Sequence, residues 1–229
     1  MRINFLKRCF SRQFVLYGSF GLCMVYFCSC GKQKPTNLAD SYFKLAFTEL
    51  SEGDDREGTY RRALGFIQKA IDCSPKAEYY ALQGSLLFKL NDIEKSKQAY
   101  EQALKSAPTG STIKAEIFNN YACLLAQQGD MAQAKKYLHQ LIGDTAYQTP
   151  EVAWVNMGKV LAGEKDFNGA MDCFSKAAHL EPNYLDAHWN LALVARELGQ
   201  NKKAKLALDT ILTLEPTHAG AARLLAQVG

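Results

Sequence analysis

Two cysteines one residue apart, Cys28 and Cys30, are the first residues of this 229-residue sequence whose types and spacing could do chemistry. Such a pair could act as a redox couple, supply part of a metal site, or mark a point where the chain is cut and anchored. No histidine or second cysteine pair lies close by, so a metal site here has too few ligands for tetrahedral zinc. The preceding segment helps to decide between the other two possibilities.

The first 29 residues have the pattern of a secretory signal peptide. Four basic residues and no acidic residue fall within positions 1–12, and positions 13–31 carry no charge. The apolar stretch 14–29 is shorter than the roughly 20 residues that a membrane-spanning helix needs, and Gly18, Ser19 and Gly21 interrupt it. We therefore predict a cleaved signal over residues 1–29 rather than a permanent span.

The end of this signal resembles the lipobox of bacterial lipoproteins, in which small residues precede a cysteine that is lipidated and becomes the new N-terminus. Ser29 and Gly31 fit that pattern around Cys30, whereas Phe27 stands where leucine is usual. The resemblance implies that Cys30 is the lipid-attachment site. An aspartate after this cysteine retains enterobacterial lipoproteins at the inner membrane, so Gly31 implies the periplasmic face of the outer membrane.

The net positive charge of the chain comes from the signal peptide. The chain has 27 Lys and Arg against 23 Asp and Glu, and the signal holds four of the basic residues and none of the acidic ones. With no basic run outside it, we expect no nucleic-acid partner. The spacing of Cys73, Cys123 and Cys173 suggests no disulfide framework, so we expect small apolar helix residues at these positions.

A repeated motif organises the remaining sequence. A small residue is followed by a larger apolar residue four positions on, by another small or aliphatic residue three positions later, and usually by a proline. A unit without the proline occurs at Ala134, Leu138 and Leu141. The units with the proline are Ala63-Ile67-Ala70-Pro75, Ser96-Tyr100-Ala103-Pro108, Ala170-Phe174-Ala177-Pro182 and Ala204-Leu208-Ile211-Pro216.

A second row of small residues predicts a partner helix before each of the last four units. Gly84, Ala122, Gly158 and Ala192 are spaced by 38, 36 and 34 residues, and 34 is the length of a tetratricopeptide repeat. We predict an all-α tetratricopeptide-repeat superhelix, or solenoid, over residues 39–229, with about five repeats and a C-terminal cap helix. Residues 30–38 would form the lipidated N-terminus and a short linker.

The small residues have a packing role, because helices that cross 8–10 Å apart leave little room for side chains. We expect Tyr80, Phe118 and Trp154 to fill the space around these crossings. The prolines should end each second helix, and turns are expected at residues 129–130 and 199–200. The segment 54–60 predicts a longer loop inside the first hairpin.

A stripe of apolar residues on the predicted first helices is the main candidate partner site. Polar residues would be usual on an exposed concave face, so an apolar stripe there indicates partner binding. The alternative is that the N-terminal phenylalanines simply pack on the next hairpin. The last repeat places Trp189 and Leu193 on the same stripe. The candidate residues are Phe43, Phe47, Leu50 and Phe88.

Asn120, Asn156 and Asn190 recur at one position of three successive first helices. An asparagine amide offers one acceptor and two donors, so a row of amides could bind the backbone of an extended peptide. The alternative is that each amide satisfies local backbone groups within the repeat.

Sequence patterns for catalysis are absent. There is no His-Glu-x2-His motif, no glycine-rich phosphate loop and no Gly-x-Ser-x-Gly elbow. The four histidines fall in different places with no ligand spacing. We expect a binding scaffold rather than an enzyme, with no cofactor and no metal.

The segments "FNNYACLLAQQGDMAQAKKYLHQLIGDTAY" and "PEVAWVNMGKVLAGEKDFNGAMDCF", after a lipobox, resemble the PilF/PilW family of type IV pilus biogenesis lipoproteins. The family pattern Asn-Asn-Tyr-Gly-x2-Leu is matched by Asn119, Asn120, Tyr121 and Leu125, with Ala122 in place of glycine. The resemblance implies a pilotin, an outer-membrane lipoprotein that binds the pilus secretin and promotes its assembly and localisation. The alternative is another envelope tetratricopeptide lipoprotein, acting as an adaptor in outer-membrane protein assembly or in recruiting cell-wall enzymes.

Overall fold

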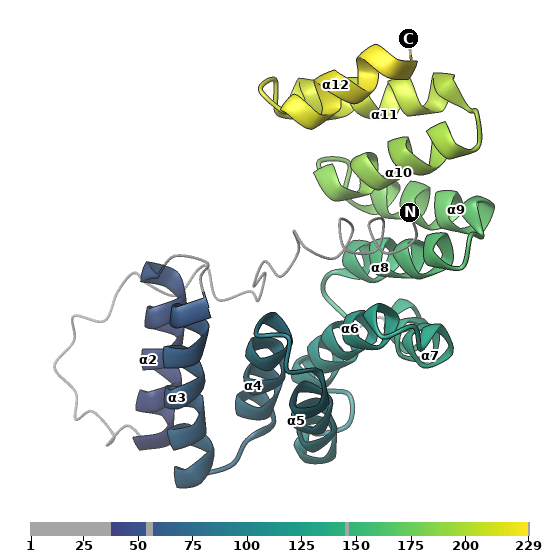
Figure 1. Cartoon of the computed structure of the whole chain (residues 1–229). Helices are drawn as coiled ribbons and strands as arrows, with labels where there is room; N and C mark the ends of the chain where they lie inside the picture. Colours follow the sequence, from purple (N-terminus) through teal and green to yellow (C-terminus); the bar gives the residue numbers. More distant parts are fainter. Residues whose placement is uncertain (1–37, 54–56, 145–146, 229) are drawn as a thin grey trace, which may run out of the picture. The chain divides into compact units, whose positions relative to one another are not determined.

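The structure of the chain is a computed structural model, and it describes residues 38–53, 57–144 and 147–228 (Figure 1). The regular structure of these residues is entirely helical, as the sequence predicts. The helices are α2 (Leu38–Glu52), α3 (Glu57–Cys73), α4 (Ala77–Lys89), α5 (Ile93–Ser106), α6 (Thr112–Gln127), α7 (Met131–Ile142), α8 (Pro150–Gly163), α9 (Phe167–Leu180), α10 (Leu185–Glu197), α11 (Asn201–Leu214) and α12 (Ala219–Val228).

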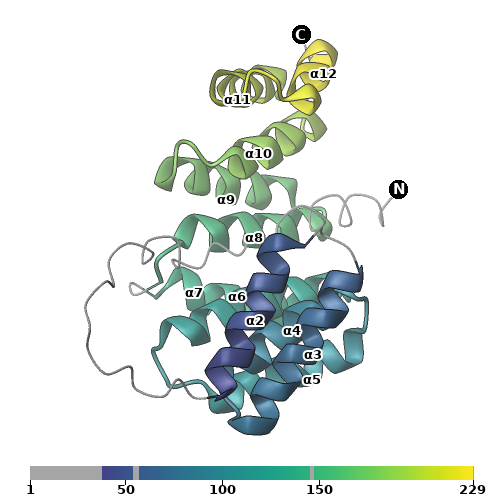
Figure 2. The ribbon, with the colours of Figure 1, turned by 90° about the vertical axis from the view of Figure 1, so that its left-hand side faces the viewer.

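The chain divides into two compact units, and the division falls within α6, between Ile117 and Phe118. We call the described residues up to 117 the N-terminal unit and those from 118 onwards the C-terminal unit. In the N-terminal unit, α2 packs on α3, α3 on α4 and α4 on α5. In the C-terminal unit, α8 to α12 follow one another as successive layers (Figure 2).

The same turn joins the two helices of the four hairpins that start at α4, α6, α8 and α10. After α4, the Asp92 N–H donates to the Leu87 carbonyl at 2.9 Å and the Asn91 N–H to the Phe88 carbonyl at 3.0 Å, which is a Schellman motif. This motif requires a positive φ two residues past the helix. The residues there are Asn91 (60°), Gly129 (87°), Lys165 (70°) and Gly199 (69°).

The glycine turns predicted at 129–130 and 199–200 are therefore confirmed. The residue after each positive-φ residue is the N-cap of the second helix, and in two hairpins this N-cap is an aspartate whose side chain accepts a hydrogen bond. Asp130 accepts a hydrogen bond from the Gln133 N–H at 3.1 Å, and Asp166 accepts one from the Gly169 N–H at 2.9 Å. Each cap satisfies a backbone donor that a helix start would leave unpaired.

Proline ends the second helices as predicted. Helices α3, α5, α9 and α11 each end two residues before one of Pro75, Pro108, Pro182 and Pro216. Proline has no N–H to donate and disfavours helical backbone at the residue before it. The second helix α7, whose unit lacks this proline, ends at Ile142 followed by Gly143.

Glycines make close crossings in two hairpins. A Cβ added to Gly84 would lie 3.0 Å from the Tyr100 ring, and one added to Gly158 would lie 2.5 Å from the Phe174 ring. The Ser96 hydroxyl donates to the Gly84 carbonyl at 2.7 Å, which explains a buried serine at this small position.

The aromatic rings that contact these glycines come from the second helices, whereas Tyr80 and Trp154, which we expected around the crossings, pack on neighbouring core clusters instead. Both side chains are partly exposed, and the Trp154 ring lies 4.3 Å from the Lys176 ammonium. Phe118 does pack across its hairpin, with its ring centroid 5.1 Å from that of Tyr137. A ring beside a glycine must come from the opposite helix, because only there does the missing side chain leave space.

The longer loop predicted over residues 54–60 is also wrong, because α3 begins at Glu57. Residues 54–56 lie outside the described part of the chain. Thr59, Ala63 and Ile67 are buried at intervals of four residues, which is the periodicity of one helix face. This buried stripe extends the helix through Gly58 despite the turn-like sequence.

Candidate partner-binding surfaces

The predicted lipid-attachment site, Cys30, and the signal before it lie outside the described residues, which begin at Leu38. Among the helices of the described ranges, none combines the length and apolar character that crossing a membrane would require.

Phe43, Phe47 and Leu50 lie together on α2 in the N-terminal unit. The Phe43 and Phe47 ring centroids are 4.9 Å apart at 80°, an edge-to-face arrangement. All three side chains are partly buried against the core that includes Ala46 and Tyr79. We call these three residues the α2 apolar cluster.

The sequence left two interpretations of these phenylalanines, partner binding and packing on the next hairpin, and the structure has features of both. Phe43 packs on the next hairpin, since its ring centroid lies 4.8 Å from that of Tyr79 on α4. Phe47 and Leu50 keep part of their surface accessible. Phe88 differs from them, because it is buried near the C-terminal end of α4 with 9% of its surface exposed.

An ion pair holds the start of α2 against the start of α4. The Asp40 carboxylate accepts hydrogen bonds from the Lys76 ammonium at 2.6 Å and from the Tyr79 hydroxyl. Both hydrogen bonds lower the pKa of Asp40, and the bond from Lys76 has the larger effect. Burial raises the pKa of Tyr79, and its hydrogen bond to Asp40 raises it further. This arrangement fixes the helix that carries the α2 apolar cluster.

The three predicted asparagines do not form a uniform row of exposed amides. Asn156 is buried, and its Nδ2 donates to Oδ1 of Asn119 on α6 at 2.8 Å. Asn120 is partly buried and accepts from Asn119 at 3.4 Å. Asn190 is buried and donates to the Asp186 carbonyl at 2.7 Å. Two of the three amides therefore use a donor inside the C-terminal unit.

A buried lysine, which the sequence patterns did not predict, lies on the same helix as Asn156. The Lys159 side chain is 2% exposed, and its ammonium lies 3.0 Å from the Asp186 carboxylate on α10. The only sequence signal is that Lys159 lies between the apolar Val155 and Ala162 on one helical face, and the structure shows that all three positions are buried. The ion pair joins the first helices of two successive hairpins.

Two of the described cysteines and one histidine, His218, occupy structural positions. Cys123 and Cys173 are buried, and burial raises the pKa of each thiol to about 11, which keeps it protonated at neutral pH. Cys73 is exposed instead. His218 accepts the Ala221 N–H at 3.0 Å through Nδ1 and packs against Trp189. Within the described ranges, no cluster of His, Cys, Asp and Glu is suited to a metal ion.

Comparison with known proteins agrees with this architecture. Tetratricopeptide repeat models match residues 161–228, and also residues 77–109 and 115–143. The TPR repeat-containing protein MJ1428 of Methanocaldococcus jannaschii is 23% identical over 199 residues, which is 82% of this chain and 32% of that protein. The chain spans about a third or less of the length of the curated relatives it matches first.

Two solved structures are similar over most of their length. PilF of Pseudomonas aeruginosa has a TM-score of 0.71 and 21% identity, covering 83% of this chain and 82% of PilF. PilW, a widely conserved type IV pilus biogenesis factor, has a TM-score of 0.71 and 21% identity, covering 83% of this chain and 90% of PilW.

These matches define the chain as a tetratricopeptide-repeat protein, and the predicted fold class is confirmed. Its fold is similar to those of PilF and PilW.

Proposed function

We propose that this chain is an outer-membrane lipoprotein of type IV pilus biogenesis, acting as a pilotin that binds the pilus secretin and promotes its assembly and localisation. The observation that carries the proposal is the similarity of fold to PilF and PilW across most of all three chains. The repeat architecture supports a scaffold role, because stacked hairpins offer long surfaces to protein partners.

The proposed lipid anchor at Cys30 limits how far the repeats can lie from the membrane. Cys30 is eight residues before the start of α2 at Leu38, and a fully extended chain spans at most about 3.6 Å per residue. The first helix would therefore begin within about 29 Å of the anchored cysteine. A partner bound to α2 would stay close to the membrane that it must enter.

The α2 apolar cluster is the proposed contact for the secretin segment. Partly exposed aromatic side chains usually supply much of the binding energy at an interface. Phe88, being buried on α4, would not make a large contact. Asn120, Asn156 and Asn190 would contribute at most a few polar contacts that fix register, because Asn156 and Asn190 already donate inside the C-terminal unit.

We infer a non-enzymatic role from the same features. The nucleophiles Cys123 and Cys173 are buried with raised pKa values, so neither offers a thiolate at neutral pH. His188 and His218 bond to nearby backbone groups, as helix and turn residues do.

The proposal is tested by replacing Phe47 with serine in the bacterium that carries the gene. Phe47→Ser should reduce secretin multimers and surface pili by about tenfold or more, as expected for the loss of an interface anchor worth over 1.4 kcal/mol. Leu206→Ser is the matched control, because Leu206 is an apolar side chain that is 69% exposed on α11. Wild-type multimer levels in Phe47→Ser would contradict the proposed surface.

Lipidation is tested separately with a labelled fatty acid. Cys30→Ser should abolish labelling, whereas Cys28→Ser should leave it intact. If both single variants are labelled normally, the anchor is misassigned. Capture of an outer-membrane assembly component or a cell-wall enzyme by the wild-type protein, with no secretin, would favour the alternative envelope adaptor.

A further inference from the structure

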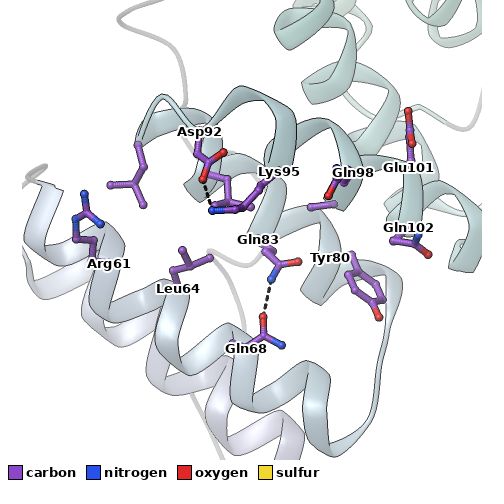
Figure 3. Close-up of a pocket in the computed structure, with 13 residues that line it drawn as sticks. Arg61, Leu64, Gln68, Tyr80, Gln83, Asp92, Lys95, Gln98, Glu101 and Gln102 are labelled. Carbon is purple, nitrogen blue, oxygen red and sulfur yellow. Dashed lines mark hydrogen bonds and ion pairs between the residues drawn. The ribbon is translucent and has the colours of Figure 1, made fainter.

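A groove in the N-terminal unit is lined by residues other than those of the α2 apolar cluster. Side chains of α3, α4 and α5 line it, and its volume is about 620 Å³ (Figure 3). This volume falls within the roughly 300–1,000 Å³ of typical ligand sites. Lining residues recur at intervals of three and four along all three helices, so the groove runs beside three helix faces.

The groove opens on a different face of α4 from the predicted partner stripe. Tyr80, Gln83 and Leu87 of α4, with Leu90 at its C-terminal cap, line the groove. They are centred about 160° around the helix from the stripe that contains Phe88, at 3.6 residues per turn. Its other walls are α3 and α5, which are both second helices. A ligand here would leave the α2 apolar cluster free for another partner.

The bottom of the groove is apolar. Leu87 is 7% exposed and Ala99 is 4% exposed, and the partly buried Leu64 lies beside them. A small apolar side chain could contact these atoms without displacing any hydrogen bond of the protein. The bottom therefore suits a short apolar side chain better than a charged group.

Glutamine amides surround this apolar patch. Gln68, Gln83, Gln98 and Gln102 line the groove from three helices. The Gln83 Nε2 donates to the Gln68 Oε1 at 3.0 Å, which orients two of these amides toward each other across α3 and α4 (Figure 3). Each amide has one acceptor and two donors, and each peptide unit presents one donor and one acceptor. The lining thus matches the hydrogen-bonding groups of a main chain.

The charges around the groove balance. Arg61 and Lys95 contribute two positive charges, and Asp92 and Glu101 contribute two negative charges. Lys95 donates to Asp92 at 2.8 Å (Figure 3), and Arg61 pairs with Glu57. Because the positive and negative charges balance, the lining has no surplus charge to offset the hydration that a charged ligand side chain would lose, and it therefore favours an uncharged ligand.

We infer that this groove binds a short, extended and uncharged peptide segment of a partner protein. Its main chain would bond to the glutamine amides while one small apolar side chain contacts Leu64, Leu87 and Ala99. The groove follows α5 from Lys95 to Gln102, about 10 Å at 1.5 Å per residue. That length fits three or four extended residues at about 3.3 Å each. The inference stands independently of the proposed pilus function.

The test uses the full chain in detergent micelles and the side-chain amide signals of its glutamines in ¹⁵N NMR spectra. The probe is the acetylated and amidated hexapeptide STLTST. It should shift the signals of Gln68, Gln83, Gln98 and Gln102 saturably, with a dissociation constant of about 1 mM or tighter. Versions with Glu or Lys in place of the polar residues, or with N-methylated backbone amides, should bind at least about tenfold more weakly.

Variants separate the groove from other binding surfaces. Gln98→Leu and Gln83→Leu should each weaken binding several-fold, and helical circular dichroism checks that they fold. Gln133→Leu, at an exposed site on α7, should bind as the wild type does. Three results would overturn the inference: no shift of these signals by any peptide, equal or tighter binding of the charged versions, or the same shifts on raising protein concentration alone.

Discussion

Phe47 and Lys159 occupy the same position of the repeat, because each directly follows a small residue of a first helix, Ala46 or Gly158, yet the two lie in very different surroundings. Phe47 on α2 packs partly on the core of the N-terminal unit and keeps some of its ring accessible. Lys159 on α8 is 2% exposed at its side chain and pairs with Asp186 on the next first helix. One position therefore offers apolar surface in one unit and joins neighbouring repeats in the other.

The contrast shows how the repeat separates stability from recognition. Glycine crossings, Schellman turns and proline stops recur in the hairpins and maintain the fold. The row of first-helix side chains is free to vary, because the crossing does not depend on it. We therefore expect changes in this row to affect binding in the N-terminal unit and stability in the C-terminal unit.

The largest effect should come from destroying a crossing in the C-terminal unit. Gly158→Phe places a ring where even a Cβ would lie 2.5 Å from Phe174, and overpacking of this kind costs about 1–3 kcal/mol or more. Thermal unfolding followed by circular dichroism should show a lower melting temperature. Gly65→Ala is the control, because a Cβ at Gly65 has no neighbour within 4 Å. An unchanged melting temperature in Gly158→Phe would show that the register is wrong.

The next effect should come from breaking the ion pair at the compared position. Removing one partner of a fully buried pair costs about 3–5 kcal/mol. The Asp186 side chain is 24% exposed and water can reach it, so we expect Lys159→Met to cost about 1–3 kcal/mol. Lys135→Met removes the more exposed pair with Glu164 and should cost about 0–1 kcal/mol in denaturant titrations. Equal losses in the two variants would argue against a special role for Lys159.

A smaller effect on stability should come from substitutions at the positive-φ residues of two similar turns, Lys165 and Gly199. Lys165 has a φ of 70°, where Gly199 has 69° in the next hairpin. A side chain in this conformation costs about 1–2 kcal/mol, so Lys165→Gly should stabilise and Gly199→Ala should destabilise the protein, each by about 1 kcal/mol. Opposite shifts of the urea midpoint are the expected result. Destabilisation by Lys165→Gly would mean that the lysine side chain stabilises the turn.

The smallest effect should be the loss, at acidic pH, of the ion pair that Asp40 forms in the N-terminal unit. The pKa of Asp40 is lowered from its ordinary 3.8, chiefly by the Lys76 hydrogen bond. A lowered pKa gives stability that is present above pH 3.8 and is lost as the pH falls through the folded-state value. NMR signals of the Phe43 and Tyr79 rings should therefore broaden or shift below about pH 4. Asp40→Asn should abolish this pH dependence, and persistence of the transition in that variant would exclude Asp40 as its cause.

The sequence predicted the parts of the fold that have local causes. The prolines at 75, 108, 182 and 216 each follow the end of a second helix, and the glycines at 129 and 199 provide the turn conformation. The same turn at Asn91 and Lys165 was missed, because neither residue type demands a positive φ. Its position follows from the length of the hairpin rather than from the residue that adopts it.

The candidate sites were harder to predict, because burial depends on neighbouring hairpins. Phe88 and Phe47 share a predicted stripe, yet Phe88 is 9% exposed while Phe47 is partly accessible. Lys159 was overlooked, since a charged residue is rarely fully buried and its partner Asp186 lies 27 residues away. The glutamine-lined groove joins three helices, and no single helix pattern reveals it.

The central claim is that the α2 apolar cluster contacts the pilus secretin. It is tested most directly by placing a photoreactive phenylalanine analogue at Phe47 and, in a separate strain, at Leu206, followed by irradiation of living cells. Mass spectrometry of the purified adducts should identify the secretin from position 47 and no secretin from position 206. Secretin adducts from position 206 alone, or no secretin adduct from position 47 in cells that assemble pili, would contradict the claim.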